Sequence, residues 1–355
     1  MLTGRLSLEE FLIEERKRHS QATGDLNSLI LSAARASKVI SKQVAAGQLS
    51  GIADNIAESG VQSAQPAALY ALSRDIFIRM VQSGGRLAGM ATEVSQESLR
   101  LPDTEERGKY LLLFNPLEGA ANLDINVPAG SIFSVLRAKN PGQDPSPEDF
   151  LRPGHEQVCA GYAVYGPSTM LVLTVGNGTH GFTLDPVLGE FVLTHPELRI
   201  AVNTAEFAIN ASNHRFWEPA VKLYVDECVA GETGPRDKDF TMRWTASVVA
   251  DAHRILMRGG VFLNPRDAQH PRKKSMSRLL FEANPLAFIV EQAGGGASTG
   301  HTNILDLPPK SLQQRVGLIF GSANEVKRIA DYHDEQPAED FDAPLFGFRG
   351  LFRNA

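Results

Sequence analysis

The order of hydrophobic patterns along the chain limits the folds that it can adopt. Six short apolar segments of strand type follow one another between residues 110 and 194, and turns rich in glycine and proline separate them. After residue 199 the pattern changes, because long helical segments alternate there with short strands. We therefore predict an α/β fold of two domains, at residues 1–199 and 200–355, with a tail at 335–355.

The spacing of apolar residues gives the position of each predicted element. The predicted helices lie at residues 25–46, 67–82, 217–230, 245–258, 277–293 and 323–333. The predicted strands lie at residues 110–114, 131–137, 158–166, 169–175, 181–185, 190–194, 260–263 and 317–320. Gly47 is expected to end the first helix. Residues 140–150 are predicted to form a surface loop.

Charge and cysteine usage exclude several classes of protein. The 355 residues include 35 basic and 41 acidic side chains. The net charge of −6 lacks the excess of positive charge that binding to nucleic acid or an anionic membrane surface requires. Cys159 and Cys228 are too few for a disulfide framework or a cysteine-rich zinc site. The chain lacks both a membrane-length apolar run and the pattern of a signal peptide. We expect a cytoplasmic protein with neither nucleic acid nor membrane as a partner.

The segment FNPLEGAANLDIN at residues 114–126 is the strongest chemical signal in the sequence. It directly follows an apolar strand, and an acidic turn with a glycine there would place carboxylates and free backbone amides at one point. A magnesium–phosphate site requires that combination. By itself the segment also fits an ordinary turn in which Glu118 lies in solvent.

The same region resembles the signature of class I fructose-1,6-bisphosphatases. The resemblance begins at residues 107–137 and continues through 156–185, 207–227, 248–267, 279–295 and 314–326. It implies the five-layered αβαβα sugar-phosphatase fold and a homotetramer that acts in gluconeogenesis or the Calvin cycle. It also implies magnesium ions that polarise the 1-phosphate and activate a water molecule.

The sequence departs from this family at positions that the family uses for catalysis. The signature Asp-Pro-Leu-Asp-Gly-Ser-Ser-Asn reads here, at residues 115–122, NPLEGAAN. Tyr70, Val94 and Asn115 stand where the family has carboxylates, and an amide cannot hold two divalent cations as a carboxylate does. Of the family's metal ligands, the resemblance retains Glu93, Glu118, Glu282 and the Leu117 carbonyl. These would hold one magnesium ion weakly.

Substrate-binding positions are kept only in part. The residues that match the family are Gly119, Asn122, Asn210, Arg243 and Arg278. In the family, the arginine that corresponds to Arg243 reaches across a subunit interface. The positions that depart from the family are Ala120, Ala121, Trp244, Asn264 and Met276.

Four residues of this sequence resemble residues of the family's AMP site: Thr23, Gly24, Lys109 and Tyr110. The start of a helix offers free N–H groups to a phosphate. A capped helix start beside an exposed lysine fits the same residues.

From the lost carboxylates we predict a pseudoenzyme with a regulatory or structural role, which assembles with itself or with an active paralogue. Two alternatives stay open. The first is a functional or weak magnesium-dependent fructose-1,6-bisphosphate 1-phosphatase that uses Glu93, Glu118 and Glu282. The second is a sensor that binds a phosphorylated ligand near Lys109 and Tyr110 without chemistry.

Overall fold

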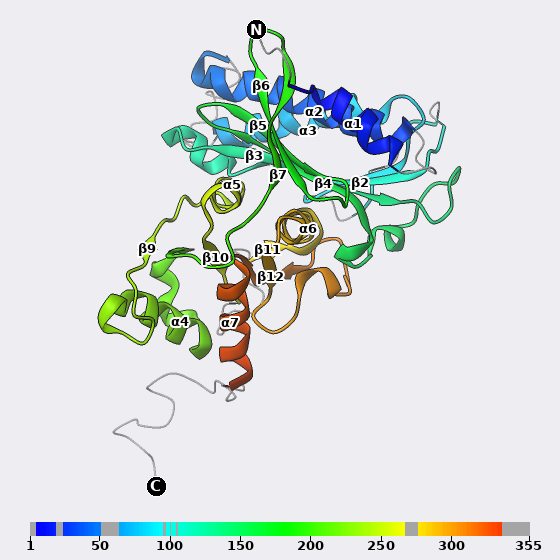
Figure 1. Ribbon diagram of the computed structural model, residues 1–355. Helices are drawn as coiled ribbons and strands as arrows, with labels where there is room; N and C mark the ends of the chain where they lie inside the picture. The colour runs from blue at the N-terminus through cyan, green and yellow to red at the C-terminus, as the bar shows by residue number, and fades with distance from the viewer. Residues whose placement is uncertain are drawn as a thin grey trace.

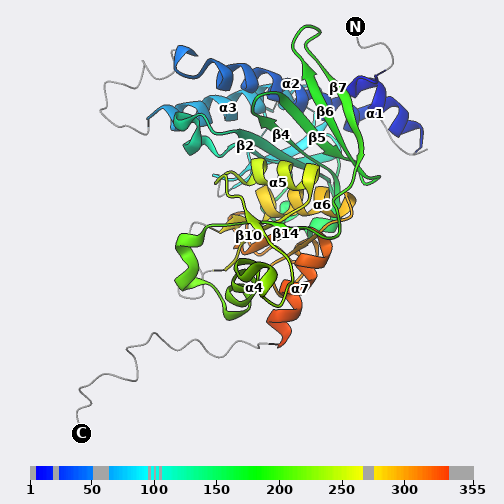
Figure 2. The same cartoon turned by 60° about the vertical axis from the view of Figure 1, so that its left-hand side comes forward.

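The computed structural model describes residues 5–18, 24–50, 64–94, 97–99, 101–103, 106–266 and 276–335. Helices and sheets alternate in five layers, as Figures 1 and 2 show. The predicted αβαβα fold is therefore confirmed. Within the described residues, no helix combines the length and the apolar composition that a membrane span needs.

The outer helical layer consists of α1 (Leu8–Lys17), α2 (Gly24–Ala46) and α3 (Ala64–Gln82). Its apolar side chains recur at helical spacing on α2, where Leu29, Ala33 and Ile40 are fully buried. On α3, the ring of Phe77 stacks on Phe114 of the sheet below at a centroid distance of 4.7 Å. This apolar contact joins the first layer to the second.

The second layer is a sheet of seven strands in sequence order, antiparallel except for the parallel pair β1 and β2. The strands are β1 (Leu87–Thr92), β2 (Tyr110–Glu118), β3 (Ala129–Arg137), β4 (Gln157–Tyr165), β5 (Thr169–Thr174), β6 (Thr179–Asp185) and β7 (Glu190–Leu198). Helices cover both faces of this sheet. The central strands therefore read as continuous apolar runs rather than as alternating patterns.

The middle layer holds α5 (Val248–Arg258) and α6 (Asn284–Gln292), which lie between the two sheets. Nearly every residue of α6 is buried, because the helix touches a sheet on either side. The second sheet has the order β12-β14-β10-β8-β9. Its strands are β8 (Glu206–Ile209), β9 (Thr241–Met242), β10 (Val261–Asn264), β12 (Gly296–Ser298) and β14 (Leu318–Gly321); the separate pair is β11 (Ser277–Arg278) and β13 (Arg315–Val316).

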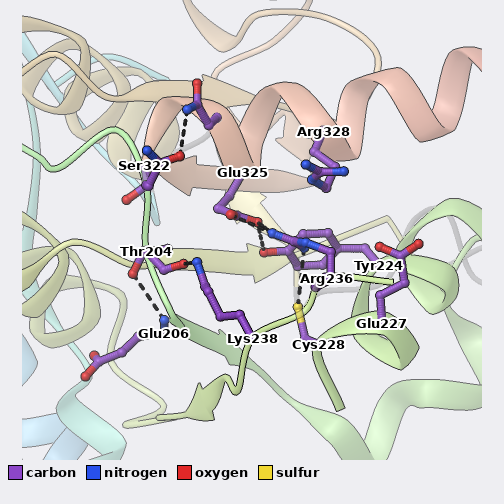
Figure 3. A network of polar contacts seen from close by, with 12 residues as sticks. Thr204, Glu206, Tyr224, Glu227, Cys228, Arg236, Lys238, Ser322, Glu325 and Arg328 are labelled. Atoms are coloured by element: carbon purple, nitrogen blue, oxygen red, sulfur yellow. Dashed lines mark hydrogen bonds and ion pairs between the residues drawn. The ribbon is translucent and has the colours of Figure 1, made fainter. Parts of the chain in front are cut away.

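The fifth layer consists of α4 (Pro219–Ala230) and α7 (Ala323–Glu335), which a buried polar network connects (Figure 3). Arg236 donates through Nη2 to both carboxylate oxygens of Glu325, at 2.7 and 2.8 Å. The Tyr224 hydroxyl of α4 donates to the same carboxylate at 2.8 Å. The carboxylate is thus fully paired although it is buried, as a charge in a protein interior must be.

The structure corrects several predicted boundaries. Strand β2 continues to Glu118, so the turn begins only at Gly119. The predicted loop at 140–150 ends in a 3₁₀ turn (Pro147–Phe150), and Phe150 is fully buried. The predicted helix at 277–293 consists of β11, a π-helical turn (Leu279–Ala283) and α6. Thr23 and the tail beyond residue 335 lie outside the described residues.

Candidate active site

A cavity of about 280 Å³ collects residues from both halves of the chain. The sequence-predicted residues that line it are Glu118, Asn210, Trp244, Asn264, Met276 and Glu282. The lining residues that sequence reasoning missed are Asn213, Ala246, Val248, Phe262, Ser277 and Arg315. Residues far apart in the sequence therefore meet at one place, which is the usual setting of a small-molecule site.

Glu118 lies at the end of β2, and the first turn of α5 holds its carboxylate. It accepts hydrogen bonds from the Ser247 hydroxyl at 2.8 Å and from the Val248 and Val249 N–H groups at 3.1 and 3.2 Å. These donors belong to a helix N-terminus, which favours a negative charge. The next residue must be glycine, because Gly119 has a φ of +74° and a Cβ there would lie 3.1 Å from the Ser247 hydroxyl oxygen.

Two carboxylates, those of Glu118 and Glu282, line the cavity, and that of Glu93 lies near Glu282. Each of the three has a pKa raised to about 7. Burial is the largest cause for Glu93, Glu118 and Glu282 alike. The charge of Glu282 raises the pKa of Glu118 further, and the charge of Glu93 raises that of Glu282. Like charges affect one another in this way only when they are close.

The chemistry of these side chains suits a magnesium ion, but the ligand atoms of the three glutamates do not all lie within 4.8 Å of one another. Carboxylate oxygens are the ligands that a hard divalent cation prefers, and a cation would relieve the repulsion among the three groups. Glu93 Oε2 is buried and has no hydrogen-bond partner among the described residues. An orphaned buried carboxylate oxygen is costly unless a cation or donor meets it.

The three positions with lost carboxylates have different surroundings. The buried Asn115 side chain accepts a hydrogen bond from the Leu117 N–H at 3.3 Å. This bond lies where the pairing of β2 with β3 shifts register. Burial and the neighbouring Glu93 raise the pKa of the Tyr70 hydroxyl, which thus lies beside the carboxylate cluster. Val94 is exposed, so its side chain lies at the surface rather than in the cluster.

The predicted substrate-binding residues are also placed by contacts within the chain. Asn210 accepts from the Ser212 N–H at 3.2 Å, and Asn122 donates to the Ala246 carbonyl at 3.0 Å. Arg243 pairs with Glu206 at 3.0 Å. Asn264 donates to the Ser277 hydroxyl at 3.3 Å.

Two arginines bring positive charge to the carboxylate end of the cavity. The Arg278 N–H donates to Glu282 Oε2 at 3.2 Å, and the Arg278 charge lowers the pKa of both Glu93 and Glu282. Arg315 lines the cavity and donates to the carbonyl of Met276 at 2.5 Å. A cation thus lies next to the position where Met276 replaces a basic residue. No sequence pattern marks Arg315, because its place depends on the pairing of β13 with β11.

The structure also brings together part of the predicted AMP site. Lys109 Nζ lies 3.2 Å from Asp25 Oδ2 in the first turn of α2, which begins at Gly24. Tyr110 is buried at the start of β2. A ligand role for these residues stays a prediction.

Comparison with known proteins identifies the chain. Residues 6–196 match the family model described as fructose-1-6-bisphosphatase, N-terminal domain, and residues 200–334 match that of the C-terminal domain. The chain belongs to the fructose-1,6-bisphosphatase family. It is 56% identical over 352 residues to the fructose-1,6-bisphosphatase class 1 3 of Methylibium petroleiphilum, which covers 99% of each chain. It is 55% identical to the class 1 protein of Hydrogenophilus thermoluteolus, over 98% of this chain and 97% of that one.

A solved structure shows the same fold. The holo form of Leishmania major fructose-1,6-bisphosphatase aligns with a TM-score of 0.82 at 34% identity, covering 93% of this chain and 99% of that chain.

The prediction of a pseudoenzyme is wrong. Four curated relatives, 49–56% identical over 98–100% of this chain, carry the name fructose-1,6-bisphosphatase class 1. The prediction gave the lost carboxylates more weight than the glutamates that the sequence keeps, of which Glu118 and Glu282 line one cavity. The expected active paralogue rested on the same inference, so nothing motivates it now.

Proposed function

We propose that the chain is a magnesium-dependent fructose-1,6-bisphosphate 1-phosphatase. The observation that carries this proposal is the pair of Glu118 and Glu282 in a cavity that Arg315 also lines, with Glu93 close to Glu282. Similarity to curated enzymes of this name along the whole chain supports the same reaction.

The three glutamates would hold the metal. When bound, magnesium supplies a Lewis acid for a phosphoryl oxygen and lowers the pKa of a water molecule. The chain's own contribution is to fix the carboxylates in advance. The N-terminal turn of α5 orients Glu118 through three donors, and the Arg278 N–H orients Glu282. Such preorganisation avoids a reorganisation cost during the reaction.

The basic and amide side chains of the cavity would bind the sugar phosphate. Burial and the charge of Arg278 lower the pKa of Arg315. A guanidinium nevertheless stays protonated in proteins, so Arg315 keeps its positive charge. Asn210, Asn213 and Asn264 place amide groups around the cavity. Arginine and amide donors suit phosphate and hydroxyl oxygens respectively.

Tyr70 and Asn115 stand at two positions where the family has carboxylates, and they limit the number of metal ions that the site can hold. With Tyr70 beside Glu93 and Asn115 engaged by a backbone N–H, the cluster has charge for fewer ions than the family signature provides. We include in the proposal a single, weakly held magnesium ion, a cytoplasmic homotetramer, a role in sugar-phosphate metabolism, and a domain division near residue 199.

Phosphate release from fructose 1,6-bisphosphate by variants of the carboxylate cluster tests the proposal. Glu282→Gln keeps the side-chain shape and removes one charge. Its matched control is Glu291→Gln on α6, because Glu291 is also half-buried with a raised pKa but accepts a hydrogen bond from Asn303 and does not line the cavity. We expect Glu282→Gln to lose about 100-fold or more in kcat/KM, and Glu291→Gln to keep the activity of the unaltered chain. Equal activity of Glu282→Gln and the unaltered chain would overturn the assignment.

A further inference from the structure

A second cluster of metal-binding side chains lies in the layer of α4 and α7, outside the catalytic cavity. Glu218 immediately precedes α4, His301 lies in the turn after β12, and His333 lies in the last turn of α7. One ligand atom from each of the three lies within 4.8 Å of the other two. None of them lines the cavity that holds the catalytic carboxylates.

The distances are close to those of a tetrahedral metal site. His333 Nε2 lies 3.4 Å from Glu218 Oε2, and His301 Nε2 lies 3.8 Å from Glu218 Oε1. Neighbouring ligands of a tetrahedral zinc ion lie roughly 3.3 Å apart, since zinc–nitrogen and zinc–oxygen bonds are about 2.0–2.2 Å long. The His301 side chain is 49% exposed and can move to close the remaining gap.

The hydrogen bonding of His333 fixes which ring nitrogen is available. Its Nδ1 lies 2.7 Å from the carbonyl oxygen of Ile329, and a carbonyl oxygen only accepts, so Nδ1 carries a proton. In the neutral ring the lone pair is then on Nε2. Metal-binding histidines are typically oriented by such a hydrogen bond from the other ring nitrogen.

The buried contact between His333 Nε2 and Glu218 Oε2 calls for a positive charge, either a proton on His333, whose pKa Glu218 raises, or a metal ion. His333 is only 5% exposed, and neither its Nε2 nor Glu218 Oε2 has a hydrogen-bond partner among the described residues. Buried polar atoms are rarely left in this state, and a positive charge between them would satisfy both.

The surrounding chain holds the His333 ring in place. Gly300 has a φ of +101°, and a Cβ at this position would lie 2.7 Å from the ring. The His301 ring meets the His333 ring at a centroid distance of 4.5 Å and an angle of 69°. Burial would raise the pKa of Glu218, but the two histidines and Arg266 hold it below its ordinary value, so the carboxylate is charged.

We propose that Glu218, His301 and His333 form a binding site for a divalent transition metal of the zinc type. Two imidazoles and one carboxylate suit zinc better than magnesium, which prefers oxygen ligands alone. With three protein ligands, a fourth coordination position would be left for water. The ion fastens the end of α7 to the start of α4 and to the turn at 299–303.

Zinc binding by the full chain tests this site. Bound zinc and the melting temperature are measured at pH 7.5 in excess Mg²⁺, and zinc bound at the catalytic glutamates, which all the proteins share, cancels in the comparison. The test variants are His301→Ala and Glu218→Gln. The control is His214→Ala, because His214 is an exposed histidine that faces a single carboxylate, that of Asp226, at 3.9 Å.

We expect the unaltered chain and His214→Ala to bind one more equivalent of zinc than either test variant and to melt at a higher temperature when zinc is added. We expect phosphate release in Mg²⁺ alone to be the same in all four proteins, which separates this site from the catalytic cavity. Equal zinc binding by all four proteins, or none by any, would overturn the proposal. A melting temperature that responds to pH but not to zinc would show instead a protonated His333 paired with Glu218.

Discussion

The buried pair of Arg236 and Glu325 allows a quantitative test of what holds the last layer together (Figure 3). The two side chains are 7% and 4% exposed. Arg236→Met removes the guanidinium but keeps an apolar chain near the Phe240 ring, over which Arg236 lies at 4.7 Å. The Glu325 carboxylate then keeps only the hydroxyl of Tyr224. We expect a loss of about 3–5 kcal/mol in the free energy of unfolding, because one buried charge is left unpaired.

The reciprocal variant and the double variant separate this effect from lost packing. Glu325→Gln leaves the guanidinium unpaired, and we expect a similar loss. The double variant contains no buried charge, and the Gln amide oxygen still accepts from the Tyr224 hydroxyl. We expect it to lose only about 1–2 kcal/mol, less than either single variant.

Urea unfolding of the four proteins, followed by circular dichroism, measures these free energies. Losses that simply add in the double variant would refute the reasoning, since the two charges would then not depend on each other. Losses below about 1 kcal/mol in both single variants would also refute it, because that is the scale of an exposed pair.

Three further predictions concern the site and the pH response. Ser247→Ala removes a hydrogen bond to Glu118 and the N-cap of α5, so we expect about 1–2 kcal/mol lower stability in urea unfolding and a higher Mg²⁺ requirement in phosphate release. Burial lowers the pKa of His253 to about 4, so the unfolded chain takes up its proton first as the pH falls. The free energy of unfolding is therefore unaffected by this group above pH 6.5 and falls by about 3 kcal/mol as the pH drops towards 4. His253→Phe should reduce the fall in melting temperature over this pH range, and an unchanged fall would contradict this. Asn115→Asp keeps the bond from the Leu117 N–H and adds a carboxylate, so we expect half-maximal phosphate release at lower Mg²⁺, and an unchanged requirement would count against it.

Much of the fold follows from local patterns, and the exceptions have physical causes. The helix at 25–46 and the strands from 110 onward were predicted because their apolar residues recur at clear periods. Strand β1 was missed because LAGMAT contains small residues, and its parallel pairing with β2 creates it. Phe150 was expected in a surface loop because proline and acidic residues precede it, yet it packs into a core cluster with Leu280 and Phe281.

Apart from the acidic turn that contains Glu118, the site was predictable only where a resemblance identified its residues. Glu118 and Glu282 carry no spacing that would bring them together, since β2 and the turn before α6 meet only in the folded chain. Ser247 and Arg315 were missed for the same reason. The residues Glu218, His301 and His333 match no local motif, because three separate elements supply them. The predicted loss of activity shows the opposite error, since the lost carboxylates were given more weight than Glu93, Glu118 and Glu282, which the sequence keeps.

Product analysis of the unaltered chain tests the central claim most directly. The purified protein is incubated with fructose 1,6-bisphosphate and saturating Mg²⁺, and phosphorus NMR follows both phosphates, with a chelator in a parallel sample. We expect loss of the 1-phosphate signal, accumulation of free phosphate and fructose 6-phosphate, and no reaction in the chelator. A substrate that stays intact in Mg²⁺, or one that is hydrolysed equally with the chelator, would contradict the account.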